Sequence, residues 1–363
     1  MGRRRGIAAF RPWRAAADDD RRVPLHAQVL IRPAADDHRH ALRVAAGLFV
    51  PGLALLAAGR PDLIIYAVFG SFTGMYGRAE SDRLRIVHQA QAGAVLLSGV
   101  SAGVLLAGAH APAWVLVVTV AGCASMWSLL ADRLGLRPAG PFFGIFALGA
   151  TATVPAGRVA PWAAISICAA TALFCLLVSL VSALRSREPA GRRQVERGPG
   201  ALVHAARYAV AVSAAGAVGL LLGIDHANWA MASAAVPLAV VGVRDRCAPG
   251  IHGIVHRGIH RVLGTFAGLA ITAVVLLPDL PGAALAVIVM ALLFPTELFM
   301  ARHYGLALGF FTPLIMLMTD LAAPADPLTM LRDRAVDTLI GVSAGIAAAI
   351  VIRSRAGAGP RRR

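Results

Sequence analysis

The segment APWAAISICAATALFCLLVSLVSAL, residues 160–184, decides the class of fold. It contains no charged side chain, so a helix formed by it would be apolar on every face. Its length is sufficient for a bilayer crossing, which takes roughly 20 apolar residues in an α-helix. A helix also satisfies its own backbone hydrogen bonds, as lipid requires. We therefore interpret this segment as a transmembrane helix.

Similar apolar segments fill the chain on both sides of it. They predict an all-α integral membrane fold with about twelve transmembrane helices, and ten is the alternative count. Three of the segments are short for a full crossing and are therefore candidates for tilted, broken or re-entrant helices. These three are 62–77, 141–155 and 227–242; the remaining helices are expected near 41–58, 87–108, 112–131, 160–184, 203–222, 258–277, 281–300, 304–320 and 334–352.

The composition agrees with a membrane protein and argues against a soluble one. Of 363 residues, 58% are hydrophobic and 15% are charged, whereas a soluble domain is about 25% charged. The net charge of +16 comes from arginine, because the chain has no lysine. The arginines lie between and outside the apolar segments, and no nucleic-acid-reading motif accompanies them. We therefore expect a lipid bilayer, and no nucleic acid, around this chain.

The same arginines predict the orientation. If the N-terminus is cytoplasmic, the outward loops carry few arginines, and the inward connections carry nearly all the others. A crossing added or removed would invert this asymmetry downstream. Both termini are therefore expected in the cytoplasm. The outward arginines are Arg60, Arg158 and Arg332, with Arg334 at a helix mouth.

An internal repeat divides the chain into two halves. Arg43 corresponds to Arg207, and Tyr66 falls close to the position of Trp229. Two six-helix repeats of the same orientation are common in transporters, whose substrate path lies between the halves. The expected organisation is a polar cytoplasmic tail at 1–40, a first repeat at 41–184, a basic cytoplasmic linker at 185–200, a second repeat at 201–353 and a basic cytoplasmic tail at 354–363.

Two motifs of the second half resemble a known family. The first joins Asn228-Trp229-Ala230-Met231 to HRGIHRVLGT at 256–265, and the second is RAVDTLIG at 334–341. Both are similar to the fusaric acid resistance protein-like family, over about 203–352 directly and over 41–184 through the repeat. The resemblance implies a multi-pass protein of the bacterial inner membrane. It also implies kinship with aromatic acid exporters and with plant aluminium-activated malate transporters.

The chain departs from the family pattern in two ways. Larger members carry a soluble domain, where this chain has only the linker at 185–200. The first half also lacks the counterpart of Arg334 and Asp337, and has Arg158-Val159-Ala160-Pro161 in its place. The substrate and the energy coupling of family members therefore transfer to this chain less firmly than the fold does.

The second motif supplies three candidates for the substrate or proton pathway: Arg334, Asp337 and Thr338. Residues three apart share a helix face, so Arg334 and Asp337 are able to form an ion pair. Ionisable groups inside a membrane are paired or functional. Asp337 is thus either a proton carrier or substrate gate, or one partner of an interfacial anchor. Glu297 is either a second exchangeable acid or a loop residue that pairs with Arg302.

Arg261 and Trp229 are the remaining candidates. Arg261 is suited to attract an anion into a cytoplasmic vestibule, but it also fits a plain positive-inside anchor. Gly264 and Gly268 follow it with a spacing that allows close helix packing. Trp229 fits either an interfacial aromatic belt or a contact with an aromatic substrate.

No catalytic or cofactor motif accompanies these candidates. The sequence has no nucleophile elbow, zinc-protease motif, phosphate-binding loop or dinucleotide motif, and its four cysteines show no metal spacing. We expect no enzyme, no cofactor and no metal. The leading interpretation is a proton-coupled exporter of small organic anions, for which the family resemblance implies aromatic carboxylic acids. A passive organic-anion channel and a non-transporting envelope scaffold are the alternatives, and a homo-oligomer is compatible with all three.

Overall fold

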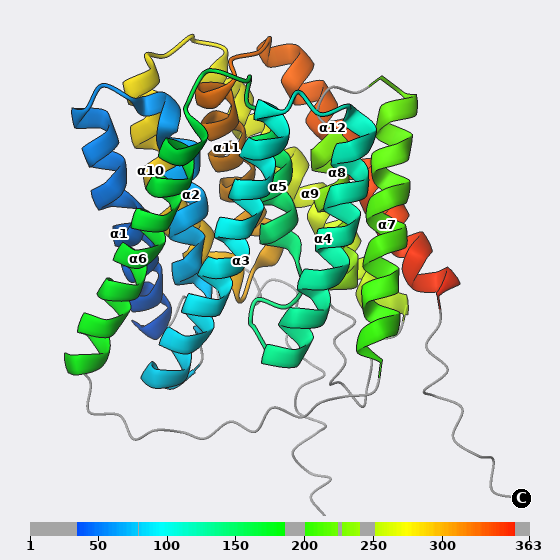
Figure 1. Ribbon diagram of the computed structural model, residues 1–363, viewed down its shortest axis with the longest axis horizontal. Helices are drawn as coiled ribbons and strands as arrows, with labels where there is room; N and C mark the ends of the chain where they lie inside the picture. The colour runs from blue at the N-terminus through cyan, green and yellow to red at the C-terminus, as the bar shows by residue number, and fades with distance from the viewer. Residues whose placement is uncertain (1–34, 79, 186–199, 224–226, 240–250, 353–363) are drawn as a thin grey trace, which may run out of the picture.

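The computed structural model describes residues 35–78, 80–185, 200–223, 227–239 and 251–352. Within these ranges every regular element is helical (Figure 1). Two 3₁₀ turns, η4 (Pro61–Leu63) and η5 (Phe72–Met75), flank α2. The α-helices are α1 Ala35–Ala57, α2 Ile64–Ser71, α3 Asp82–Gly108, α4 Ala113–Leu134, α5 Phe142–Ala152, α6 Pro161–Arg185, α7 Ala201–Leu221, α8 Ala227–Leu238, α9 Ile251–Leu276, α10 Gly282–Met300, α11 Tyr304–Ala322 and α12 Pro327–Val351.

Each of the twelve predicted segments corresponds to one of these helices. Nine described helices are long and apolar enough to cross a membrane. The other three are α2, α5 and α8, with 8, 11 and 12 residues, and they fall in the segments predicted to be short. The chain is therefore a multi-span membrane protein with nine candidate spans and three shorter helices.

Four helices begin five to seven residues earlier than expected from the sequence, among them α3, which starts at Asp82 instead of near 87. α1 starts at Ala35, inside the segment expected to be a polar tail, and α9 starts at Ile251 instead of near 258. α12 starts at Pro327, because the carboxylate of Asp326 caps the helix by accepting a hydrogen bond of 2.8 Å from the backbone N–H of Thr329. Arg334 consequently lies inside α12 and not at its mouth, and it is buried.

Four helices form the buried centre of the bundle, and the others surround them. Every residue of α2 and α8 is buried, as are most residues of α5 and α11, so these four helices make the centre. The surrounding helices leave apolar side chains such as Leu184, Leu221 and Val351 exposed, which suits a lipid-facing surface. The central helices are therefore the ones that can line a site inside the bundle.

The helix contacts recur when six is added to each helix number. α1 packs on α10 as α7 packs on α4, and α5 packs on α8 as α11 packs on α2. α3 packs on α5 as α9 packs on α11. The contacts between α1–α6 and α7–α12 therefore form two outer seams, α1–α10 and α4–α7, and a central interface.

Glycine pairs set the close approach of α3 to α5 and of α9 to α11. A Cβ added to Gly99 would lie 2.9 Å from the carbonyl oxygen of Gly144, and one added to Gly103 would run into that of Leu148. Likewise, a Cβ on Gly264 would run into the carbonyl oxygen of Gly305. The prediction that Gly264 and Gly268 allow close packing is thus confirmed.

Replacing Gly268 with alanine is expected to destabilise the bundle. The added Cβ would lie 2.5 Å from Cβ of Thr312 and 2.9 Å from the carbonyl oxygen of Leu308, so α9 and α11 must separate. Overpacking of this kind costs about 1–3 kcal/mol. Thermal unfolding of the purified protein in detergent measures the loss. Gly309→Ala is the matched control, because a Cβ there meets nothing within 4 Å. Equal melting temperatures for the two variants would contradict the prediction.

The two ends of the bundle differ in charge. The connections 76–78, 80–81, 135–141 and 301–303 meet at the end that lies at the bottom of Figure 1, and most of the described arginines lie in them or in the helix segments at this end of the bundle. We call this the basic end, and define it by Arg78, Arg83, Arg85, Arg133, Arg137, Arg257, Arg261 and Arg302. Gly77 and Gly140 allow the chain to turn there, with φ values of 74° and 84° that favour glycine.

Candidate functional site

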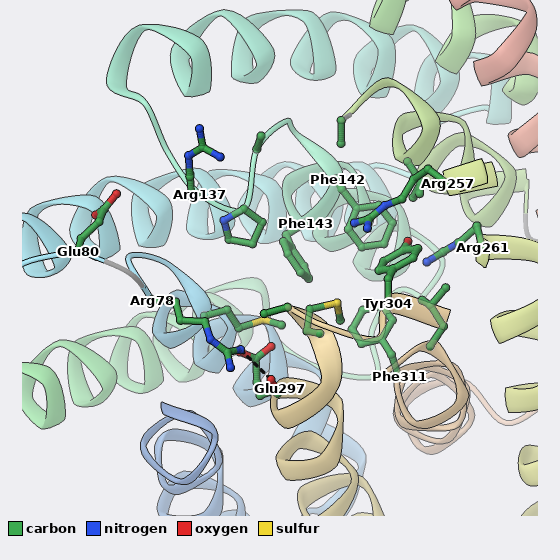
Figure 2. Close-up of a pocket in the computed structure, with 18 residues that line it drawn as sticks. Arg78, Glu80, Arg137, Phe142, Phe143, Arg257, Arg261, Glu297, Tyr304 and Phe311 are labelled. Carbon is green, nitrogen blue, oxygen red and sulfur yellow. Dashed lines mark hydrogen bonds between the residues drawn. The ribbon is translucent and has the colours of Figure 1, made fainter. Parts of the chain in front are cut away.

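A cavity of about 310 Å³ opens at the basic end, where the short helices α2 and α8 end and α5 begins (Figure 2). Residues from both α1–α6 and α7–α12 line it, so it lies between the two sets of helices. Its wall combines cationic, acidic and aromatic side chains. These are Arg78, Arg137, Arg257 and Arg261; Glu80 and Glu297; and Phe142, Phe143, Tyr304 and Phe311.

Two of the arginines come from one face of α9 and stack on aromatic rings. The guanidinium carbon of Arg257 lies 3.4 Å from the ring centroid of Tyr304, and that of Arg261 lies 5.1 Å from the centroid of Phe142. Such cation–π contacts compensate a buried charge only in part. They hold both guanidinium groups on the aromatic side of the cavity (Figure 2).

Arg261 carries a charge that the described residues do not neutralise. Its side chain is 1% exposed, and Nε and Nη2 have no hydrogen-bond partner within the described ranges. A buried guanidinium with unused N–H groups is costly in a membrane, and a bound carboxylate would satisfy it with two parallel hydrogen bonds. Arg261 lines the cavity and is buried, so a simple surface anchor does not describe it, and its role in attracting an anion stays a prediction.

The aromatic wall is continuous with the centre of the bundle. Phe143 meets Phe311 edge-on at a centroid distance of 6.3 Å, and Phe142 lies 6.2 Å from Phe311. Phe72 of η5 lies 5.1 Å from Phe143, which extends the cluster from α5 to η5. A planar aromatic ligand would find edge and face contacts here.

Arg78, on the opposite wall, is already neutralised. Its Nη2 donates to Oδ1 of Asp37 at 2.7 Å, and its Nη1 donates to the backbone oxygen of Glu297 at 2.9 Å. The Nε of Arg302 donates to the other oxygen of Asp37 at 2.6 Å. The suggested pairing of Glu297 with Arg302 is therefore wrong, because Arg302 pairs with Asp37 of α1, whose carboxylate lies between Arg78 and Arg302.

Glu297 lies within α10, where it is buried at the cavity wall. Its Oε2 is 3.1 Å from Nε2 of His40, and its Oε1 has no hydrogen-bond partner among the described residues. Pro295 precedes it without ending the helix. Glu297 is thus not a solvated loop residue, and it joins α10 to α1 across the seam.

A second polar group lies beside the cavity, between α8 and α12. The guanidinium carbon of Arg334 lies 5.3 Å from the ring centroid of Trp229, and both residues are fully buried. The expected Arg334–Asp337 ion pair does not form, since neither oxygen of Asp337 has a hydrogen-bond partner in the described part of the chain. Arg334 turns towards Trp229 instead and lies close enough to Arg261 for their charges to repel.

Thr338 and Trp229 are the remaining candidates. Thr338 donates its hydroxyl hydrogen to the backbone oxygen of Arg334 at 2.8 Å, and its place on a substrate or proton pathway stays a prediction. Trp229 is buried within α8, at the centre of the bundle, so the interfacial-belt interpretation is wrong for it. Trp114 and Trp162, at helix ends, are 64% and 73% exposed and do match such a belt.

Sequence reasoning missed the aromatic wall. Phe142, Phe143, Tyr304 and Phe311 come from two helices that are far apart in the chain, and each reads as ordinary apolar content of a membrane segment. Arg257 was noted only as a neighbour of Arg261. Its four-residue spacing from Arg261 was the available signal, because it places both guanidinium groups on one helix face.

These features define a multi-span helical membrane protein with an arginine- and aromatic-lined cavity between two sets of six helices. Residues 213–348 match the family described as fusaric acid resistance protein-like, so the chain contains a domain of this family. The match confirms the resemblance seen in the second half, and its span includes Trp229, Arg257, Arg261, Glu297, Arg334 and Asp337. No curated protein and no solved structure matches the chain.

Proposed function

We propose that the protein exports small organic anions, with aromatic carboxylic acids as the substrate class, by proton-coupled secondary transport. The observation that carries the proposal is the buried and unneutralised guanidinium of Arg261 over the ring of Phe142 in the cavity wall. A carboxylate fits the guanidinium, and an attached aromatic ring fits the phenyl rings beside it.

The size of the cavity supports a small substrate. Ligand pockets are commonly 300–1,000 Å³, and this cavity of about 310 Å³ is at the lower end of that range. A one-ring acid fits this volume. The cavity is also mostly lined by apolar side chains with a few charged ones, as small-molecule sites are.

The direction of transport follows from the proposed orientation. Arginine-rich ends of membrane proteins face the cytoplasm, so we place the basic end and both termini there. The cavity then opens to the cytoplasm. The recurring helix contacts support two six-helix repeats, at 41–184 and 201–353, with the substrate path between them. A location in the bacterial inner membrane accords with this arrangement.

Coupling to protons accords with the buried acids. Asp337 has two unpartnered oxygens in the described structure, and Glu297 has one at the cavity wall. Either carboxyl group is able to gain and lose a proton as the substrate's charge enters and leaves the neighbouring arginines. The sequence has no phosphate-binding loop, so an ion gradient is the proposed energy source.

Uptake of radiolabelled benzoate into proteoliposomes with an acidic lumen tests the proposal. A permeant weak acid collects passively in the alkaline compartment, so accumulation in the acidic lumen requires exchange with outgoing protons. We expect such accumulation, and we expect an uncoupler to abolish it. Protein-free liposomes are the control.

The other outcomes identify the alternatives. Flux that only equilibrates benzoate, at a rate independent of the pH gradient, would indicate a passive organic-anion channel. An absence of flux for benzoate and for a panel of aromatic and dicarboxylic acids would support an envelope scaffold and overturn the transport proposal.

A further inference from the structure

The seam between α4 and α7 contains a buried histidine with two hydrogen-bond acceptors. Nδ1 of His204 lies 3.0 Å from Oδ2 of Asp132 on α4, and Nε2 lies 3.1 Å from the backbone oxygen of Leu238, the last residue of α8. The His204 side chain is 3% exposed, and that of Asp132 is 14% exposed. One imidazole thus joins three helices at the basic end.

This geometry requires a proton beyond the one that a neutral imidazole carries. A neutral ring has one N–H and one acceptor nitrogen, while a carboxylate and a carbonyl oxygen only accept. With Asp132 ionised and His204 neutral, one of the two contacts would bring two acceptors together. Both contacts become hydrogen bonds when a proton lies between Nδ1 and Oδ2, either on the ring or on the carboxyl group.

The opposite seam provides a comparison without this requirement. Nε2 of His40 faces Oε2 of Glu297 at 3.1 Å, while its Nδ1 accepts a hydrogen bond of 2.9 Å from Nη2 of Arg43. A neutral ring with its hydrogen on Nε2 satisfies both contacts. The two seams are otherwise alike, since each places a histidine three residues before an arginine on α1 or α7 and opposite a carboxylate on α10 or α4.

The arginine that follows His204 does not replace the missing donor. Nε of Arg207 donates to the backbone oxygen of Ile352 at 2.8 Å, so the guanidinium is directed towards the end of α12. Among the described residues, the titratable groups against His204 are Asp132 from α4 and Tyr208 from its own helix, whose ring centroid is 4.9 Å away. α8 presents the Leu238 oxygen. In the described part of the chain, a proton is therefore the species that completes this site.

We propose that His204 and Asp132 form a proton-binding site that controls the position of the end of α8. Binding adds one proton to the pair and removes its single negative charge; release restores the neutral ring and the ionised carboxylate. With the proton bound, His204 is hydrogen-bonded to α4 and α8 at once. This inference rests on the proposed proton-coupled transport and adds a site distinct from Asp337 and Glu297.

The site reaches the cavity through α8. Val236 and Ala239, on either side of Leu238, line the cavity. The negative end of the α8 dipole also favours a cation at Leu238, so a protonated ring binds there more strongly than a neutral one. Loss of the proton weakens the contact that fixes this end of α8, and the cavity wall formed by Val236 and Ala239 is then free to shift.

Nitrogen-15 NMR of the histidine rings tests proton binding without any transport assay. In purified protein at neutral pH, we expect the His204 signal, assigned by its loss in His204→Gln, to show a ring protonated on both nitrogens. A neutral ring together with an infrared band of a protonated carboxyl group, absent from Asp132→Asn, would equally place the proton in the pair. A neutral His204 with an ionised Asp132 would overturn the proposal.

Benzoate transport tests the coupling. For one coupled proton, the accumulation ratio changes about tenfold per pH unit of gradient, because each tenfold ratio corresponds to about 1.4 kcal/mol. We expect His204→Gln and Asp132→Asn to lose this dependence while they still exchange labelled for unlabelled benzoate at equal pH. Ser125→Ala is the seam control, because its hydroxyl donates to the backbone oxygen of Ala205 at 3.3 Å and does not titrate.

The outcomes separate this inference from the proposed function. Normal pH dependence in both variants, with wild-type accumulation intact, would overturn the inference and leave the transport proposal standing. If the wild-type protein moves no benzoate, the transport proposal fails, and the nitrogen-15 result still decides whether the pair binds a proton. A loss of pH dependence in Ser125→Ala as well would show that any weakening of the seam has this effect, and would also overturn the inference.

Discussion

Replacing Arg261 with glutamine is expected to weaken benzoate binding by about tenfold to a hundredfold, since a hydrogen bond to a charged group contributes about 1.5–3 kcal/mol. Glutamine keeps one donor near Phe142 but removes the charge and the paired N–H groups that a carboxylate requires. Equilibrium binding of radiolabelled benzoate to the purified protein measures the change. This is the largest effect that we predict for a single substitution in the cavity.

Two variants sharpen the Arg261 test. Arg83→Gln removes an exposed arginine at the same end of the bundle and controls for the loss of general positive charge. Arg261→Lys keeps the charge but not the planar fork, so an intermediate affinity would identify paired hydrogen bonding as the basis of recognition. Unchanged affinity in Arg261→Gln would show that the anion binds elsewhere.

Asp337→Asn is expected to abolish accumulation of benzoate in an acidic lumen while exchange at equal pH continues. Asparagine has nearly the shape of aspartate, so α12 should pack as before, but its amide neither binds nor releases the coupled proton. Asp337 has no hydrogen-bond partner in the described structure, and its removal therefore breaks no bond to the protein. The ratio of accumulation to exchange is the informative quantity, because it separates coupling from binding.

Asp326→Asn is the matched control for Asp337→Asn. It removes a carboxylate from the start of the same helix, and asparagine still caps the helix there. We expect normal accumulation in this variant. If Asp337→Asn accumulates benzoate as well as Asp326→Asn does, Asp337 is not on the proton pathway, and Glu297 becomes the acid to test next.

The sequence predicted the helices well because each is marked by composition. Apolar segments, and the prolines and glycines between them, identified all twelve α-helices, including the three short ones. The early start of α12 was missed, because the polar residues Arg332 and Asp333 resemble a loop. The structure places these residues within a helix whose Arg334 and Asp337 are buried against α8.

The site was predictable only in part, because it depends on contacts between distant segments. Arg261, Glu297, Arg334 and Asp337 stand out in sequence, since charge is rare in apolar surroundings. Their partners do not: nothing local indicates that Arg334 turns to Trp229 and leaves Asp337 unpaired, or that His204 meets Asp132. Helix packing determines these contacts, and the packing cannot be inferred from a single sequence.

The correspondence between the glycine pairs also indicates how many anions one chain can hold on the proposed function. Gly99 of α3 and Gly264 of α9 make equivalent contacts, so Arg257 and Arg261 correspond to Ala92 and Leu96, two buried apolar residues. The helix contacts recur, but the cationic lining does not. On the proposed function, saturation therefore occurs at a single bound molecule per polypeptide. The two corresponding helices then present unlike surfaces: α9 supplies the cationic side chains, and the corresponding positions of α3 are apolar.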